Sequence, residues 1–199
     1  MNKKILLILS LVAFSLASKA QTRLGFKGGV NFANVTFSAS GFSISPSSIT
    51  SFHVGGVLES RLSDRIVVQP NLLFSQKGYS AEISGFSSTK ATLNYLELPV
   101  NFLYEASDYF TIGAGPYLGY ALSGKSVSNG VSTDAEFGDG GQLKRADFGL
   151  NFVAGYEVLD GLIISANYSF GLANISNEAN STVKNKVIGI SITKLFGER

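Results

Sequence analysis

The chain contains a single histidine, His53, and no cysteine. Hydrolysis by a side-chain nucleophile would need His53 as a general base, beside a nucleophile and an orienting carboxylate. His53 instead shares one face of an extended segment with Gly55 and Glu59, which favours a buried hydrogen-bonding role. The absence of cysteine excludes thiolate nucleophiles, disulfides and cysteine-ligated zinc. The sequence therefore predicts no catalytic residue.

Two other patterns resemble ligand sites. Residues 113–119 (GAGPYLG) are rich in glycine, but they alternate like a strand, and no helix follows whose N-terminus would bind phosphate. Asp134, Glu136 and Asp139 offer carboxylates for Ca²⁺, or for divalent ions that bridge to lipopolysaccharide, but their spacing lacks the complete pattern of a calcium loop. We therefore predict a solvated acidic loop, no metal site and no cofactor.

The elements that carry these residues are predicted to be strands. Apolar residues alternate with polar or small residues in eight segments, and β-strand geometry places the two sets on opposite faces of a sheet. The segments are residues 23–33, 52–61, 68–77, 95–104, 110–120, 147–157, 162–172 and 186–196. Glycines within them are explained by close approach of neighbouring strands and by curvature of the sheet.

The connections between these segments alternate between short and long. Short turns are predicted at 63–64, 106–108 and 160–161, and long loops at 35–50, 79–91, 123–143 and 173–183. Outer-membrane barrels have short periplasmic turns and long external loops, with both termini periplasmic when the strand number is even. The pattern predicts antiparallel up-and-down strands.

Composition decides which face points outward. Charged residues make up 15% of the chain, against roughly 25% in soluble domains, while 15 Phe and 8 Tyr are present. A soluble barrel with an apolar interior is the alternative, but the polar face is too narrow to cover a soluble surface. Aromatic residues also lie near the strand ends, as an interfacial girdle requires. They are Phe52, Tyr104, Phe110, Tyr120 and Phe148. We predict an all-β fold, an eight-stranded antiparallel up-and-down transmembrane β-barrel of the outer-membrane type.

The first twenty residues have the three regions of a cleavable signal peptide: a basic start, an apolar run from Ile5 to Ala17, and small residues at Ser18 and Ala20. We predict a signal peptide at 1–20 and one barrel domain at 21–199. Cleavage removes three of the 16 basic residues, so 13 remain against 14 acidic ones, a net charge of −1. The basic balance of the whole chain therefore does not indicate nucleic-acid binding.

Six stretches of the chain resemble the PorT-like outer-membrane β-barrel family of the Bacteroidetes. They are GFKGGVN (25–31), FHVGGVLESRLSDRIVVQPNLLFSQKG (52–78), NYLELPVNF (94–102), FTIGAGPYLGYAL (110–122), KRADFGLNFVAGYE (144–157) and NYSFGLANI (167–175). The resemblance covers essentially the whole mature chain, although a typical member has Glu in place of Asn71. It implies the fold and an outer-membrane location. The founding member is linked to protein secretion and the maturation of exported proteases, whereas most members have no assigned activity.

The inner face of the predicted barrel is polar. An eight-stranded barrel is only wide enough to be filled by its own side chains, so interior charges are expected to pair across it. The expected structural network is Lys27, His53, Glu59, Arg61, Lys77, Glu97, Asp147 and Glu157. A narrow ion path or a small ligand site is the alternative. Near the C-terminus, Phe196 resembles the terminal aromatic signal that barrel-assembly machinery recognises.

These observations predict a non-enzymatic integral outer-membrane protein that acts structurally or through its four long surface loops. The expected partners are outer-membrane lipid and lipopolysaccharide, the barrel-assembly machinery and other envelope or secretion proteins. A secretion accessory or a small-solute transporter is the alternative, and an outer-membrane enzyme is the third. Fold alone does not decide between them.

Overall fold

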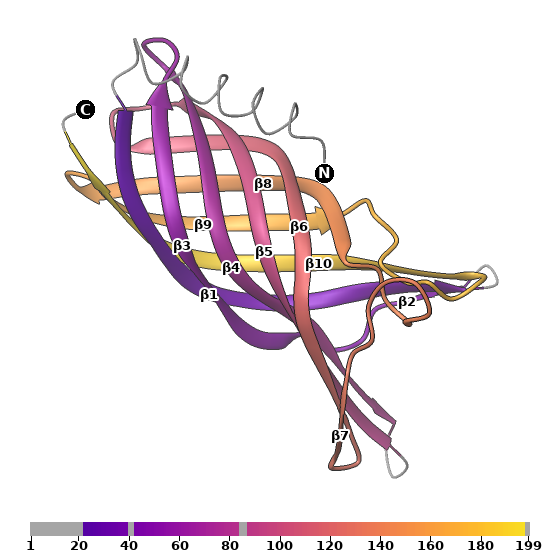
Figure 1. Ribbon diagram of the computed structural model, residues 1–199. Coiled ribbons are helices and arrows are strands. Elements are labelled where there is room, and N and C mark those ends of the chain that lie inside the picture. The colour runs from indigo at the N-terminus through magenta and orange to yellow at the C-terminus, as the bar shows by residue number, and fades with distance from the viewer. Residues whose placement is uncertain (1–21, 40–41, 84–86, 198–199) are drawn as a thin grey trace.

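The computed structural model describes residues 22–39, 42–83 and 87–197 (Figure 1). All of its regular elements are β-strands. They are β1 (Thr22–Ala39), β2 (Phe42–Ile44), β3 (Ile49–Arg61), β4 (Ile66–Ile83), β5 (Ser87–Glu105), β6 (Phe110–Ser128), β7 (Val131–Asp134), β8 (Ala146–Leu159), β9 (Leu162–Gly171) and β10 (Ser181–Phe196). No helix long and apolar enough to cross a bilayer occurs in these three ranges.

Eight long strands follow one another around a single antiparallel sheet. The order is β10-β9-β8-β6-β5-β4-β3-β1, and the short strands β2 and β7 pair with β1 and β6. The prediction of antiparallel up-and-down strands is therefore confirmed. β1 also pairs with β10, from Leu24 opposite Phe196 to Ala39 opposite Ser181. The beginning and the end of the described chain consequently lie beside each other.

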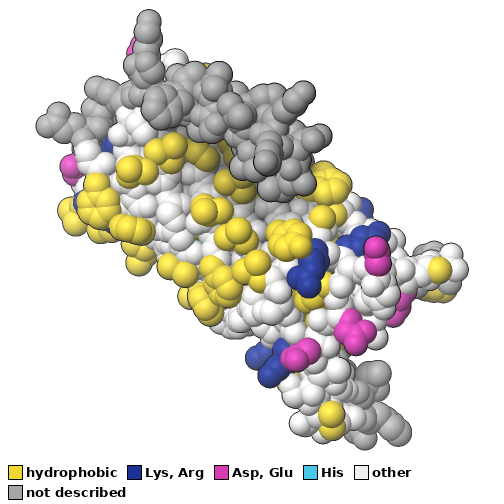
Figure 2. Space-filling view, in the orientation of Figure 1, with side chains coloured by type: hydrophobic (Ala, Val, Ile, Leu, Met, Phe, Trp, Pro, Cys, Tyr) yellow, Lys and Arg dark blue, Asp and Glu magenta, His cyan; other side chains and the backbone are white. Residues whose placement is uncertain are grey.

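Side chains alternate between the two faces of the sheet, apart from register shifts at Asn94/Tyr95 and Glu157/Leu159. On β1, Leu24 and Phe26 are 64% and 69% exposed, whereas Arg23 and Lys27 are 4% and 6% exposed. The apolar residues thus form the outer wall and the polar residues fill the interior. On the face seen in Figure 2, hydrophobic side chains gather over the wall and charged side chains gather towards the protruding hairpins.

The outer wall carries an apolar belt whose extent differs between strands, from residues 52–58 on β3 to residues 110–122 on β6. On β1, β4 and β5 it spans residues 24–32, 66–74 and 96–104, which is nine residues on each strand. The next outward residues are Asn34, Gln76 and Asn94, and the Gln76 side chain donates a hydrogen bond to Asn94 Oδ1 at 3.0 Å. A polar boundary therefore ends the belt on the side of the long connections.

The long connections differ from the prediction. They are largely strand, because β1, β4, β5 and β6 run on beyond the belt, and they end in hairpins that protrude from one end of the barrel (Figure 1). Most outward positions of these extensions are polar, among them Ser88, Lys90 and Lys125, so their composition resembles that of loops although their backbones remain paired. The three short turns lie at the opposite end, as predicted, at 62–65, 106–109 and 160–161.

Candidate functional site

The eight side chains assigned to the interior from sequence lie on the inner face, but they form separate groups rather than one network. Glu59, Arg61 and Glu157 lie near the short turns; Lys27 and His53 lie midway; Lys77, Glu97 and Asp147 lie towards the protruding hairpins. The pairing of all interior charges was also expected, and Lys27 departs from it, since no ion pair or hydrogen bond joins it to any described residue.

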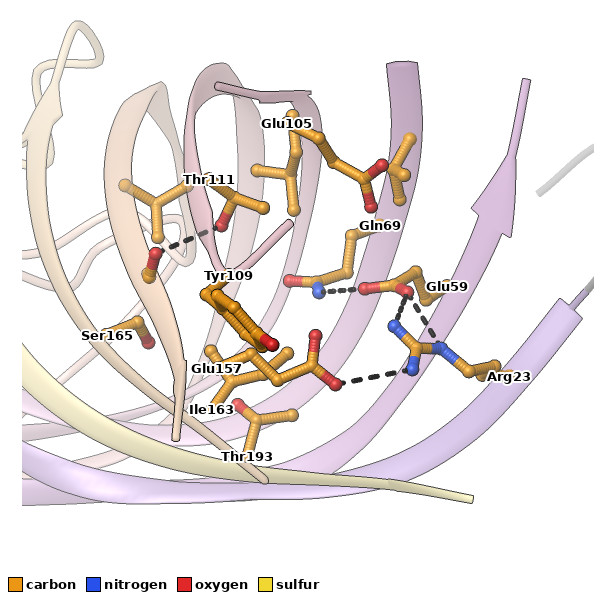
Figure 3. Close-up of a pocket in the computed structure, with 14 residues that line it drawn as sticks. Arg23, Glu59, Gln69, Glu105, Tyr109, Thr111, Glu157, Ile163, Ser165 and Thr193 are labelled. Carbon is orange, nitrogen blue, oxygen red and sulfur yellow. Dashed lines mark hydrogen bonds and ion pairs between the residues drawn. The ribbon is translucent and has the colours of Figure 1, made fainter. Parts of the chain in front are cut away.

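The group nearest the short turns is centred on Arg23 (Figure 3). Arg23 and Glu59 face each other across β1 and β3, and the guanidinium donates from Nε at 3.0 Å and from an Nη atom at 2.6 Å to Glu59 Oε1. A third nitrogen lies 3.6 Å from Glu157 Oε1, and Gln69 donates to Glu59 Oε2 at 3.1 Å. Glu157 also accepts the backbone N–H of Gly161 at 2.7 Å, which ties the group to the β8–β9 turn.

A second ion pair stands at the same end. Arg61 donates two parallel hydrogen bonds to Glu105, at 2.7 and 2.8 Å, and a third to the backbone oxygen of Asp64 at 2.9 Å. Two-point contact of this kind fixes a guanidinium more firmly than a single contact. The pair therefore ties the β3–β4 turn to the end of β5.

His53 bridges three strands in the middle of the lumen. Asn31 Nδ2 donates to the backbone oxygens of Phe52 and Gln76, so its Oδ1 faces His53 Nδ1 at 2.8 Å. Nδ1 therefore carries the proton, and Nε2 accepts from the Ser191 hydroxyl, also at 2.8 Å. A Cβ atom on the neighbouring Gly29 would lie 2.6 Å from the His53 ring, so glycine provides the room for the imidazole.

This serine, histidine and asparagine arrangement has the connectivity of a hydrolase triad with Asn in the orienting position. Its surroundings differ from those of an active site. Ser191 is 1% exposed and lies outside the lining of the cavity that His53 borders. A nucleophile must reach a carbonyl carbon of the substrate, so the geometry supports a bridge between β1, β3 and β10 better than it supports catalysis.

The third group, here called the lysine cage, surrounds Lys77. Its ammonium lies 2.5 Å from Glu97 Oε1 and 3.1 Å from Asp147 Oδ2, and it faces the rings of Tyr117 and Tyr95 at 4.5 and 5.0 Å from their centroids. Asp147 Oδ2 also accepts from the Tyr117 hydroxyl at 3.2 Å and from Asn185 at 2.9 Å. Lys77 is 1% exposed and Asp147 is 2% exposed. The cage is therefore a buried, cross-linked charge cluster.

An apolar layer, here called the outer plug, covers the lysine cage on the hairpin side. Its buried members are Val35, Leu93, Tyr95, Ala121, Ile175 and Val183, and Phe37, Tyr79, Ala135, Phe137 and Leu143 pack against them. Ile175 comes from the β9–β10 connection, and Phe137 and Leu143 from the segment between β7 and β8. The lumen is thus covered at this end by chain that folds back over it.

Small cavities lie between these groups of described residues. One, beside Arg23 and Glu157, measures about 20 Å³, and another, beside Lys27 and His53, measures about 40 Å³. A water molecule needs roughly 10 to 15 Å³ measured in this way. The space is sufficient for a few water molecules and insufficient for an organic solute.

The acidic residues of the predicted loop do not converge. Asp134, Glu136 and Asp139 are all exposed, and Asp134 lies opposite Lys125 in the β6–β7 pairing. Nowhere in the described ranges do three or more His, Asp or Glu side chains gather closely enough to hold a metal ion.

Several residues of the site were missed from sequence. Arg23 and Glu105 complete the ion pairs, and Asn31, Tyr95 and Tyr117 complete the His53 bridge and the lysine cage. Arg23 lies within the predicted segment 23–33, where the alternation places it on the same face as Lys27, and Glu105 continues the inward series of β5, so a longer alternation window would have included Glu105.

Comparison with known proteins agrees with this architecture. Residues 17–177 match the family described as "Outer membrane protein beta-barrel domain". Neisserial surface protein A is 12% identical over 86% of this chain and 97% of its own, with a TM-score of 0.52. Ail, the attachment invasion locus protein of Yersinia pestis, is 15% identical over 87% of this chain and 99% of its own, with a TM-score of 0.48.

At such low identity the likeness to Neisserial surface protein A shows a common fold and nothing more. No curated protein sequence matches the chain. The family match, however, covers most of the chain, and it agrees with the alternating strands and the apolar wall. The chain belongs to the outer membrane protein beta-barrel domain family.

Proposed function

We propose that this outer-membrane protein is a closed, plugged, non-catalytic barrel that presents its protruding hairpins as an interaction surface outside the cell. The proposal is carried by the combination of outer plug and packed lumen: the cage and plug occupy the hairpin end, and the cavities beside Arg23 and beside Lys27 measure only about 20 and 40 Å³. A path for a solute is thereby disfavoured, and the exposed hairpins are left as the working part. Phe42 and Val131, on β2 and β7, are 81% and 67% exposed there.

Closure as an eight-stranded transmembrane barrel is part of this proposal. The pairing of β1 with β10 supports it, because it leaves neither strand as a free edge along the apolar belt. The height of the belt on β1, β4 and β5 also supports it, since nine residues fall within the roughly 9 to 11 that a tilted strand needs to cross the hydrocarbon layer. Lipid and lipopolysaccharide are then the surroundings of the wall.

Export and orientation complete the proposal. The predicted signal peptide, residues 1–20, lies outside the described residues, and the barrel domain is assigned to 21–199. The short turns and both ends of the mature chain are assigned to the periplasm, in keeping with the general design of these barrels.

Orientation can be tested with single cysteine variants, because the natural chain has no cysteine. We expect Asn129→Cys, in the exposed β6–β7 turn, to react on intact cells with a maleimide attached to a polymer too large for porins. Ser63→Cys, in the exposed β3–β4 turn, should react only after the outer membrane is permeabilised. The reverse pattern would place the hairpins in the periplasm.

Transport of small solutes is the principal alternative, and the electrical conductance of the inserted protein distinguishes it from the proposed plugged barrel. Because side chains fill the lumen, we expect no steady current when the native protein is inserted into planar bilayers at high salt. An open porin inserted by the same protocol serves as the control, and a gel-mobility shift on heating shows that the barrel is folded. A steady current from folded protein would favour the transport alternative.

A secretion accessory of the PorT-like kind is the second alternative, supported by the resemblance of stretches such as QPNLLFSQKG (69–78) and YLELP (95–99). Its working surface would be the periplasmic turns rather than the hairpins. Capture of secretion components through a cross-linker at Ser63, but not at Asn129, would favour it.

Recognition by the barrel-assembly machinery is proposed for Phe196, which is 53% exposed on the outer wall and meets Phe26 edge to face at 6.2 Å. We expect Phe196→Ala to lower the amount of heat-modifiable protein in the outer membrane. Phe102→Ala, at a similarly exposed position of the same wall, is the matched control for loss of lipid contact. Equal levels in the two variants would count against a signal at Phe196.

A further inference from the structure

Lys27 is the one lumen lysine or arginine, among the described residues, that has no carboxylate partner. Arg23, Arg61 and Lys77 each lie within 3.1 Å of a Glu or Asp oxygen, whereas no ion pair or hydrogen bond involves Lys27. Lys27 is nevertheless only 6% exposed. A buried ammonium without a counter-charge is costly, so Lys27 either loses its charge or has a partner from outside the chain.

The cavity of about 40 Å³ beside Lys27 contains a second unsatisfied donor. Asn101 is 1% exposed, and its Oδ1 accepts a hydrogen bond from Asn151 at 2.8 Å, but its Nδ2 finds no acceptor. Lys27 and Asn101 both line this cavity. Two buried donors that face one polar space require an occupant with acceptor character.

The carboxylate that borders the same cavity does not meet this requirement. Glu97 is held by Lys77 at 2.5 Å, and Lys77 in turn is shared with Asp147. The cage contains two carboxylates for one ammonium, a net charge of −1, but both carboxylates contact Lys77 and neither forms an ion pair with Lys27. Water would satisfy Asn101 Nδ2 but would leave the Lys27 ammonium without a counter-ion in contact with it.

We propose that the cavity binds one small inorganic anion, of which chloride is the abundant example, with Lys27 as its counter-ion and Asn101 Nδ2 as a hydrogen-bond donor. The volume limits the class of ligand, since about 40 Å³ has room for roughly three water-sized spheres and excludes organic acids. The anion would be a structural component of the lumen. This inference is independent of the role assigned to the hairpins.

The test compares refolded native protein with Lys27→Met in detergent, by urea titration at constant ionic strength in sodium chloride or sodium gluconate. Gluconate is too large for the cavity. The native midpoint is expected to rise with chloride and to saturate, as it must when a ligand binds only the folded state. Lys27→Met should lose this chloride-dependent shift, and Lys90→Met, at an exposed lysine of β5, should retain it.

Crystals grown with bromide provide a second measurement that does not depend on the variant folding. An anomalous peak beside Lys27 Nζ in the native protein is expected. A chloride shift that persists unchanged in Lys27→Met, or a bromide-grown crystal with no peak in this cavity, would overturn the proposal and leave the cavity to water.

Discussion

Replacing Lys77 by methionine is expected to lower the free energy of unfolding by about 3–5 kcal/mol, the usual cost of removing one partner from a buried ion pair. The change leaves Glu97 and Asp147 close to the former site of the ammonium with no positive charge between them. It also removes the contact of the ammonium with the rings of Tyr95 and Tyr117, which adds to the loss. Methionine retains most of the volume, so the effect reports charge.

The measurement is a urea titration of barrels refolded in lipid vesicles, read by the gel shift on heating, since the chain has no tryptophan. Lys90→Met, at an exposed lysine, should change the free energy by no more than about 0.5 kcal/mol. Adding Glu97→Gln and Asp147→Asn to Lys77→Met should recover much of the loss, because the stranded charges are then removed. A loss that these additions do not reduce would contradict the charge explanation.

Ile190→Arg is the second change with a large expected effect. Ile190 is 53% exposed on the outer wall, flanked by Ile188 and Ile192, so in a bilayer it faces hydrocarbon. Arginine on the lipid face costs about 2–4 kcal/mol of stability near the bilayer midplane. Near the interface the cost falls to about 0–1 kcal/mol. We expect the free energy of unfolding in vesicles to fall by the larger amount.

The matched control is Thr50→Arg, at an exposed residue opposite Phe32, where the belt ends. Its cost should be the smaller of the two values. If both variants unfolded at the same urea concentration as the native protein, the outer wall would not face lipid. This result would contradict the transmembrane placement of the barrel.

Alternation is the part of the structure that sequence predicted best. Because lipid lies on one side of each strand and packed polar groups on the other, every second residue is under a different constraint, and Lys27, His53 and Asp147 were all placed on the correct face. The physical cause is local to each strand. The face on which a residue lies can therefore be predicted without knowing which strands are neighbours or in what register they pair.

Partner choice in the interior was not predictable in the same way. Lys77 and Asp147 are 70 residues apart in sequence, and their contact depends on how the strands are staggered around the barrel. The same stagger leaves Lys27 without a carboxylate, although the interior contains enough of them to suggest complete pairing. The hairpin extensions were missed for a different reason: beyond the belt the outer face meets water, so the apolar signal that marks a strand disappears while the backbone pairing continues.

The outer plug also divides the surface that we propose to lie outside the cell into a part whose sequence is constrained and a part that is free to vary. Its two connecting segments are joined by backbone and side-chain bonds, among them Lys144 N–H to Ile175 O at 2.8 Å and Asn177 to the oxygens of Gly138 and Gly141. An insertion in either segment would require a matching change in the other. The β6–β7 turn is joined through Asn129 to Ser88 of β5 rather than to the two plug segments, and its left-handed Gly130 is surrounded by open space. Where antibodies or bacteriophages select for changes in the exposed surface, we therefore expect the substitutions to concentrate at the hairpin tips. The residues of the outer plug should change less.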